Sequence, residues 1–136
     1  MTLWCEQRVA IIPASLSAEI GDTVTLAKLD AIGWVRFPEA DPVGHPYWRL
    51  DHVRGGPPAE SGPVWRTPQE IIVAISQARG TCTTIASFRE QFSFPGVALV
   101  PIDDVPPVAI DLAQRRDQRN PDATQLFDEL TADIGR

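Results

Sequence analysis

The most regular pattern of apolar and polar positions in the chain lies between Thr67 and Gly80. Apolar residues recur there at helical spacing, which predicts an amphipathic helix with one face buried against a sheet. Its apolar face consists of Ile71, Ile72, Ile75 and Ala78.

Both ends of this helix carry signals in the sequence. Thr67 is predicted as the N-cap, Pro68 suits the first helical position, and Glu70 completes a capping box. Gly80 is predicted to end the helix, because glycine adopts the left-handed conformation of a C-cap without strain. The β-branched run that follows, residues 81–85, predicts a strand.

Further strands and helices alternate along the rest of the chain. Arg8 to Ile12 is a short, continuously apolar run, typical of a strand buried on both faces, and Pro13 is predicted to end it. The other predicted elements are strands at 34–37, 97–101 and 108–112, a helix at 25–31 capped by Asp22 or Thr23, helical turns at 46–52 and 87–91, and a last helix capped by Asn120. This alternation predicts an α/β fold, an open sheet with helices on its faces.

Composition narrows the class of protein. A chain of 136 residues that is 43% hydrophobic is long enough for one domain with a core. A net charge of −6 argues against direct contact with nucleic acid, because such proteins usually carry a basic face. Cys5 and Cys82 give no disulfide framework and are both expected to be core thiols, and we find neither a signal peptide nor a membrane-spanning run, so a cytoplasmic location is expected.

Motifs for catalysis or for a bound cofactor are not found. The sequence lacks a nucleophile elbow, glycine-rich phosphate loops, HExxH and CxxC. Asp103 and Asp104 are neighbours, which suits a turn better than a pair of catalytic carboxylates, and His45 and His52 have no metal-ligand spacing. We therefore expect no enzyme activity, metal or cofactor.

Two short segments are candidates for binding a small molecule. Ligands of open α/β sheets bind at the carboxyl ends of strands, and the free amides at a helix N-terminus favour an anion. The first candidate is the strand end Arg36-Phe37-Pro38, and the second is the start of the central helix, Trp65-Arg66-Thr67. Either arginine could bind a carboxylate. The alternative is that Thr67 is only an N-cap and Trp65 only a core residue.

Several stretches together resemble the effector-binding domain of LysR-type transcriptional regulators. The C-terminal half of that domain is similar to TPQEIIVAISQARGTCTTIA followed by FPGVALVPIDDVPPVAIDLAQRRDQRNPDATQLFDEL. The preceding strand, loop and helix are similar to LWCEQRVAIIPASLSAEIGDTVTLAKLDAIGWVRFP, and an insert of one family branch is similar to YWRLDHVRGGPPAESGPVWRTPQE. The resemblance covers about Leu3 to Leu130 and implies a type II periplasmic-binding-protein-like fold, here partial, with an open mixed sheet.

The resemblance also implies a domain organisation and a site. Residues 1–100 match the second regulatory subdomain, and residues 101–136 match the C-terminal segment of the first, whose N-terminal half is missing here together with the DNA-binding helix-turn-helix and the linker helix. The positions that face the effector cleft in the family match Arg36, Phe37, Pro38, Trp65, Arg66, Thr67, Pro101 and Ile102. Their chemistry suits a small organic acid.

Two main functions and an oligomeric state follow as expectations. The first function is an effector-binding regulatory domain that reaches DNA only through the missing N-terminal domain and makes no contact with a membrane. The alternative is a free-standing half-domain that binds and modulates an intact regulator; an enzyme of unknown type is a third, weaker option. The strand at 108–112 and the apolar face of the last helix lack the partners they have in the family, so a homodimer or larger assembly is expected.

Overall fold

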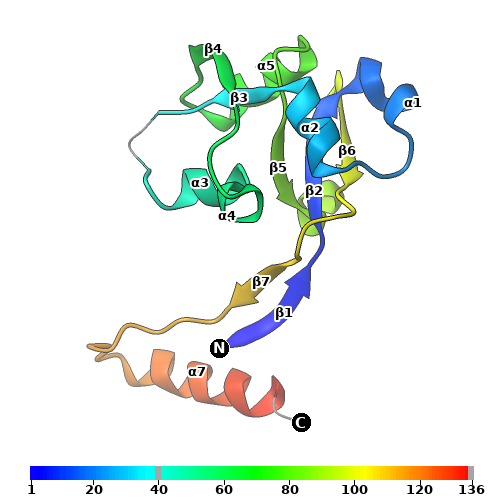
Figure 1. The fold of residues 1–136 in the computed structure, drawn as a ribbon. Coiled ribbons are helices and arrows are strands. Elements are labelled where there is room, and N and C mark those ends of the chain that lie inside the picture. Colours follow the sequence, from blue (N-terminus) through cyan, green and yellow to red (C-terminus); the bar gives the residue numbers. More distant parts are fainter. Residues whose placement is uncertain (39–40, 135–136) are drawn as a thin grey trace. The chain divides into compact units, whose positions relative to one another are not determined.

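A computed structural model describes residues 1–38 and 41–134 (Figure 1). Contacts divide the chain into two units. Unit 1 joins Met1–Glu6 to Pro107–Arg136, and unit 2 is the continuous segment Gln7–Pro106. The division by contacts has boundaries near residues 6 and 106, and the division into regulatory subdomains at residue 100 stays an expectation.

The centre of unit 2 is a three-stranded antiparallel sheet in the order β5-β2-β6. Its members are β5 (Cys82–Ile85), β2 (Arg8–Pro13) and β6 (Val97–Pro101). Every residue of the middle strand, β2, is buried, as the apolar run predicted. The two ends of unit 2 lie side by side, because Val9 pairs with Pro101 and the Ile102 N–H donates a hydrogen bond of 3.1 Å to the Arg8 carbonyl.

Alternate residues of β2 belong to two separate apolar clusters, one on each face of the sheet. Ala10 and Ile12 pack in one cluster with Leu29 of α2 (Leu26–Ile32). Ile11 packs in the other with Ile75 of α5 (Pro68–Ser76). The predicted layering, with helices on both faces of the sheet, is confirmed.

A second sheet of unit 2 consists of one parallel pair of strands. β3 (Trp34–Arg36) pairs with β4 (Glu60–Val64), and a parallel bridge joins Trp34 to Thr81, just before β5. Unit 2 therefore contains both antiparallel and parallel strand pairs. β4 was not predicted, because its sequence ESGPV contains a glycine and a proline and reads as a loop.

Short helices fill the connections of unit 2. Thr25 is the N-cap of α2, accepting a hydrogen bond of 3.2 Å from the Lys28 N–H, so the predicted caps Asp22 and Thr23 are wrong. Instead, Asp104 accepts a hydrogen bond of 2.8 Å from the Leu26 N–H at the start of the same helix. The remaining helices are η1 (Ala14–Leu16), α1 (Ser17–Ile20), α3 (Gly44–Trp48), α4 (Asp51–Arg54) and α6 (Ala86–Gln91).

The N-terminus of α5 follows the prediction and its C-terminus does not. The Thr67 hydroxyl accepts a hydrogen bond of 3.2 Å from the Glu70 N–H, and the Glu70 carboxylate accepts one of 2.7 Å from the Arg66 N–H. The helix ends at Ser76, however, and it is Ala78 that adopts the left-handed conformation, with φ of 58°. Gly80 is not the C-cap. Its backbone instead lies in close contact with the backbone of β3.

Unit 1 consists of an antiparallel strand pair and one helix. β1 (Thr2–Glu6) pairs with β7 (Val108–Asp111), and α7 (Pro121–Ile134) begins after Asn120, whose side chain accepts a hydrogen bond of 2.9 Å from the Asp122 N–H as predicted. Cys5 on β1 is exposed, so its prediction as a core thiol is wrong, whereas Cys82 is buried.

Candidate functional site

A cavity in the described part of unit 2 has a volume of about 700 Å³, within the range of pockets that hold small ligands. Its floor is the face of the sheet on the α5 side. Ile11 of β2 and Cys82 and Thr84 of β5 lie on this floor. They share it because cross-strand partners and alternate residues of a strand point to the same face, and Ile11 pairs with Cys82.

Two helices form walls of the cavity. The first turns of α5 provide Pro68, Gln69 and Ile72, and α3 provides His45 and Trp48. The start of α5 is held in place by its Thr67 cap, and α3 begins where the Asp41 carboxylate accepts a hydrogen bond of 2.7 Å from the Gly44 N–H. Each wall therefore begins at a hydrogen bond between a side chain and the backbone of its first turn.

Aromatic rings close the cavity. Phe88 lies on α6, and Phe92 and Phe94 follow this helix, with ring centroids 4.5 Å apart for Phe88 and Phe92 and 6.0 Å apart for Phe92 and Phe94. On another side, the ring of Phe37 meets that of His45 edge to face at a centroid distance of 4.0 Å. Such ring pairs favour an apolar or aromatic ligand.

The titratable groups of the cavity are mostly neutral. Burial raises the pKa of the Cys82 thiol to about 12. Burial also lowers the pKa of His45, and the positive charge of Arg49 lowers it further, so the ring is neutral at pH 7. The Asp41 carboxylate is the one group that lines the cavity as an ion among the described residues.

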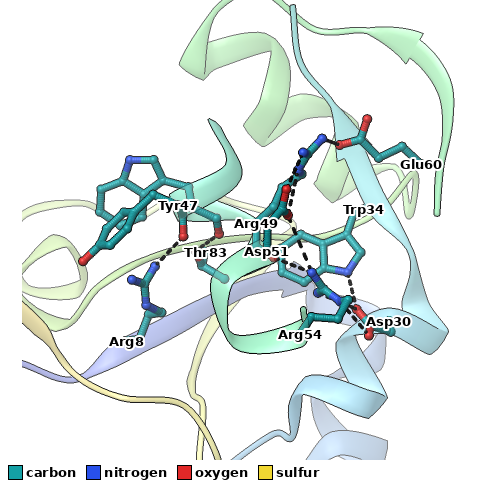
Figure 2. A network of polar contacts seen from close by, with 10 residues as sticks. Arg8, Asp30, Trp34, Tyr47, Arg49, Asp51, Arg54, Glu60 and Thr83 are labelled. Carbon is teal, nitrogen blue, oxygen red and sulfur yellow. Dashed lines mark hydrogen bonds and ion pairs between the residues drawn. The ribbon is translucent and has the colours of Figure 1, made fainter. Parts of the chain in front are cut away.

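A network of ion pairs fixes α3 and α4 against the body of unit 2 (Figure 2). The Arg49 guanidinium bridges two carboxylates, at 2.7 Å from Asp51 and in direct contact with Glu60 of β4. Arg54 reaches Asp30 of α2 at 2.7 Å. Asp30 is exposed, but the other four side chains are largely shielded from solvent, so removing the partner of one of these would leave a partly buried charge unpaired. The network thus supports the wall that carries His45 and Trp48.

Arg8 of β2 fastens the same wall from the sheet. It is 1% exposed, and its guanidinium carbon lies 4.5 Å from the ring centroid of Tyr47 and 5.4 Å from that of Trp48. It also donates a hydrogen bond of 3.3 Å to the Tyr47 carbonyl, and the Thr83 hydroxyl donates one to the Trp48 carbonyl (Figure 2). Arg8 therefore stabilises α3 through cation–π contacts, although sequence analysis did not single it out.

Acidification is expected to loosen the α3 wall through His45. The folded state lowers the pKa of His45, so the unfolded chain, with a pKa near about 6.5, binds the proton more readily. The stability that depends on a neutral His45 is therefore fully present above about pH 6.5, and it is lost as the pH falls below that value. Its Nε2 is also buried without a partner among the described residues, so a proton there would lack an acceptor.

The measurement is the free energy of unfolding at pH 7.5 and at pH 5.5. We expect His45→Gln to lose less stability over this interval than the wild type. His52→Gln, which changes an exposed histidine of the neighbouring helix, is the control and should lose as much as the wild type. An equal loss in all three proteins would show that His45 does not cause the pH dependence.

Of the three residues predicted at the strand end, two line the cavity and one does not. Phe37 and Pro38 line it. Arg36 is exposed at the end of β3 and does not line the cavity, and its carbonyl accepts a hydrogen bond of 2.9 Å from the Trp65 N–H.

The three residues predicted at the start of the central helix lie beside the cavity and do not line it. Trp65 packs against the apolar cluster that contains Ile75. Arg66 and Thr67 are exposed and take part in the cap of α5. The next residue, Pro68, is the first of this segment to line the cavity.

Pro101 and Ile102, predicted from the second crossover, lie elsewhere. Pro101 ends β6, and its carbonyl accepts a hydrogen bond of 2.9 Å from the Val24 N–H. Ile102 is 2% exposed within the apolar cluster on the α2 face of the sheet, opposite the floor of the cavity.

Sequence analysis missed most of the cavity. Trp48, Phe92 and Phe94 all line it, and none of them was predicted to lie near Phe37. A usable signal was the spacing of Phe88, Phe92 and Phe94 directly after a buried strand. Within the described residues there is no cluster of three or more potential metal ligands, and no helix long and apolar enough to cross a bilayer.

Comparison with known proteins gives a match in structure only. No family model matches the sequence, and no curated protein matches it. The structure matches CbnR, a LysR family transcriptional regulator, with a TM-score of 0.72 over 97% of this chain at 18% identity. It also matches the BenM effector-binding domain with its effector benzoate, with a TM-score of 0.66 over 98% of this chain at 18% identity. The chain has the fold of a LysR-type effector-binding domain.

This LysR-type fold is of the periplasmic-binding-protein-like class (type II), as the sequence resemblance implied. The chain matches only part of the length of each of these proteins. The chain spans 46% of CbnR and 62% of the BenM effector-binding domain. A LysR family regulator from Pseudomonas aeruginosa, HinK, gives the same result, with a TM-score of 0.60, 16% identity and 47% of its length covered.

Proposed function

We propose that this chain is the effector-binding regulatory domain of a LysR-type transcriptional regulator and that it binds a small metabolite. The observation that carries the proposal is a cavity of about 700 Å³ within a unit that has the LysR-type fold. Ligand-sized cavities lined mainly by apolar and aromatic side chains are typical of small-molecule sites. No catalytic role is proposed, and the structural neighbours are named as transcriptional regulators.

Unit 2 is then the second regulatory subdomain, and unit 1 belongs to the first. The division of the chain supports this assignment, because Gln7–Pro106 is continuous and both of its ends lead into unit 1. Contact with DNA is proposed to occur through a separate domain, since this chain carries a net charge of −6 and spans about half of the full-length regulators it matches.

A thermal-shift screen of small acids, neutral compounds and amines tests the proposal. A ligand that binds only the folded state raises the melting temperature with the logarithm of its concentration. Ile72→Trp, which places a large ring on the cavity wall, should abolish the shift. Val73→Trp is the matched control, because Val73 is the next residue of α5 and is 51% exposed. A screen in which no compound of any class shifts the melting temperature would contradict the proposal.

The second candidate function, a half-domain that binds an intact regulator, is favoured by one specific observation. The apolar face of α7 is exposed, with Leu126 at 57%, Leu130 at 38% and Ile134 at 43%. An exposed apolar face of this kind favours association with another protein. If the screen gives no shift and the chain co-elutes with a full-length LysR-type regulator, this function takes precedence.

Self-association through α7 is the expected behaviour of the isolated chain. We expect a homodimer or larger assembly at tens of micromolar, because apolar surface of α7 is buried on association. The double variant Leu126→Lys with Leu130→Lys should be monomeric by sedimentation velocity. The control, Gln125→Lys with Ala132→Lys, places the same charges on exposed positions outside this face and should associate like the wild type. A wild-type chain that sediments as a monomer at this concentration would refute the expectation.

A further inference from the structure

The charges around the cavity of unit 2 bear on which ligands it accepts. None of the described residues that line it is a lysine or an arginine. The one ionised group on its lining is the Asp41 carboxylate, which is already bonded to the Gly44 N–H at 2.7 Å. A ligand carboxylate in this cavity would therefore lose solvation without gaining a cation.

The arginines that contact the α3 wall already have interaction partners. Arg49 is paired with Asp51 and Glu60. Arg8 is buried against the rings of Tyr47 and Trp48 and is not among the lining residues. Arg36 and Arg66, which suggested an organic acid at the sequence level, do not line the cavity either. The net charge of −6 further disfavours the approach of an anion.

What the lining offers instead is aromatic surface and uncharged polar groups. Phe37, Phe88 and Phe92 present rings, and an aromatic ring also attracts a cation at its face. The Gln69 amide and the Thr84 hydroxyl line the cavity and make no hydrogen bond with any residue in the described ranges. These two groups are therefore available to a neutral hydroxyl or amide, or to an ammonium group.

We propose that the cavity binds a neutral or positively charged molecule with an aromatic body, and that it selects against carboxylates. This inference rests on the proposed effector-binding function and specifies its ligand class. The aromatic body packs against the phenylalanine rings, while a hydroxyl, amide or ammonium group bonds to Gln69 or Thr84. Asp41 adds an electrostatic preference for the ammonium form.

The test is isothermal titration of the full chain with three probes that share one ring system. The probes are 2-naphthylmethanol, 2-naphthylmethylamine and 2-naphthoate, which are neutral, positive and negative at pH 7. We expect the alcohol and the amine to bind and the naphthoate to bind at least about tenfold more weakly, a difference of about 1.4 kcal/mol.

Three variants locate the effect in the cavity. Asp41→Asn removes the charge and keeps a side chain that can accept the hydrogen bond from the start of α3. It should weaken binding of the amine about fivefold and leave binding of the alcohol unchanged. Gln69→Arg adds a cation to the lining and should bring naphthoate binding to within about threefold of the alcohol. Gln77→Arg is the control, because it places the same charge at the other end of α5, away from the cavity, and should not improve naphthoate binding.

The outcomes separate this inference from the function on which it rests. Naphthoate binding as tightly as the alcohol, or equal responses of Gln69→Arg and Gln77→Arg, would overturn the ligand class while effector binding itself stands. If acids raise the melting temperature in the screen and none of the three probes binds, the ligand class is likewise wrong. Failure of every compound in the screen contradicts both.

Discussion

Gly80→Ala is expected to destabilise unit 2 by about 2 to 5 kcal/mol. Gly80 is buried and has a φ of 140°, a region that residues with a side chain rarely occupy. A Cβ at this position would lie 2.9 Å from the Val35 nitrogen and 3.1 Å from the Trp34 carbonyl carbon. Since these are backbone atoms of β3, the clash is relieved only by separating β3 from the segment that leads into β5.

The reverse substitution in the same connection is the control. Ala78 has a φ of 58° and is exposed, so Ala78→Gly should leave stability unchanged or raise it by up to about 1 kcal/mol. Urea unfolding followed by far-ultraviolet circular dichroism measures both. A Gly80→Ala variant within about 1 kcal/mol of the wild type would show that the close contact with β3 is not required.

Trp34→Ala is expected to lower the free energy of unfolding by about 3 to 5 kcal/mol. Trp34 is 2% exposed and belongs to the apolar cluster between the sheet and α2. Its Nε1 donates a hydrogen bond of 2.7 Å to Asp30, and the Arg54 guanidinium lies 5.1 Å from its ring (Figure 2). The substitution therefore opens a cavity in the core and removes a contact of the Asp30–Arg54 pair.

Two further variants separate these contributions. Trp34→Phe keeps most of the ring and removes the donor to Asp30, and should cost about 1 to 2 kcal/mol. Trp4→Ala removes a side chain that is 52% exposed on β1, and should change the free energy of unfolding by less than about 1 kcal/mol. Urea unfolding followed by circular dichroism avoids the loss of tryptophan fluorescence in these variants. Equal effects of Trp34→Ala and Trp4→Ala would contradict the assignment of Trp34 to the core.

The elements predicted correctly are those whose signal is local. β2 is a continuous apolar run, and the start of α5 carries a threonine cap, a proline and a glutamate within four positions. These features determine the backbone over one or two turns or over one strand, so they can be identified without knowledge of the rest of the fold.

The predictions that failed depend on contacts between distant segments. The end of α5 was placed at Gly80 because a glycine there fits a C-cap, but the packing of Gly80 against Val35 requires that glycine for a different reason. β4 forms on Glu60–Val64 against the local preferences of its sequence, because β3 provides a pairing edge. Cys5 is exposed because it lies on β1, a strand in which no residue is buried.

The candidate site shows the same limit. Phe37 and Pro38, which line the cavity, were predicted because a strand end is a general location for ligands. The cavity also needs Ile11, His45 and Phe88, which come from three other segments of the chain and meet only after the sheet has formed. The orientation of His45 further depends on ion pairs of Arg49 that no spacing rule identifies.

The two ends of unit 2 lie next to each other, and this determines how unit 2 is connected to unit 1 along the chain. Because Arg8 and Ile102 are joined by a backbone hydrogen bond of 3.1 Å, the segment Gln7–Pro106 leaves and returns to unit 1 at one point of the sheet. Such an arrangement is that of an inserted module, in which a hundred-residue loop of one domain is itself a domain. The module is therefore suited to excision, to transplantation into a related host, and to circular permutation by a short link between its two ends.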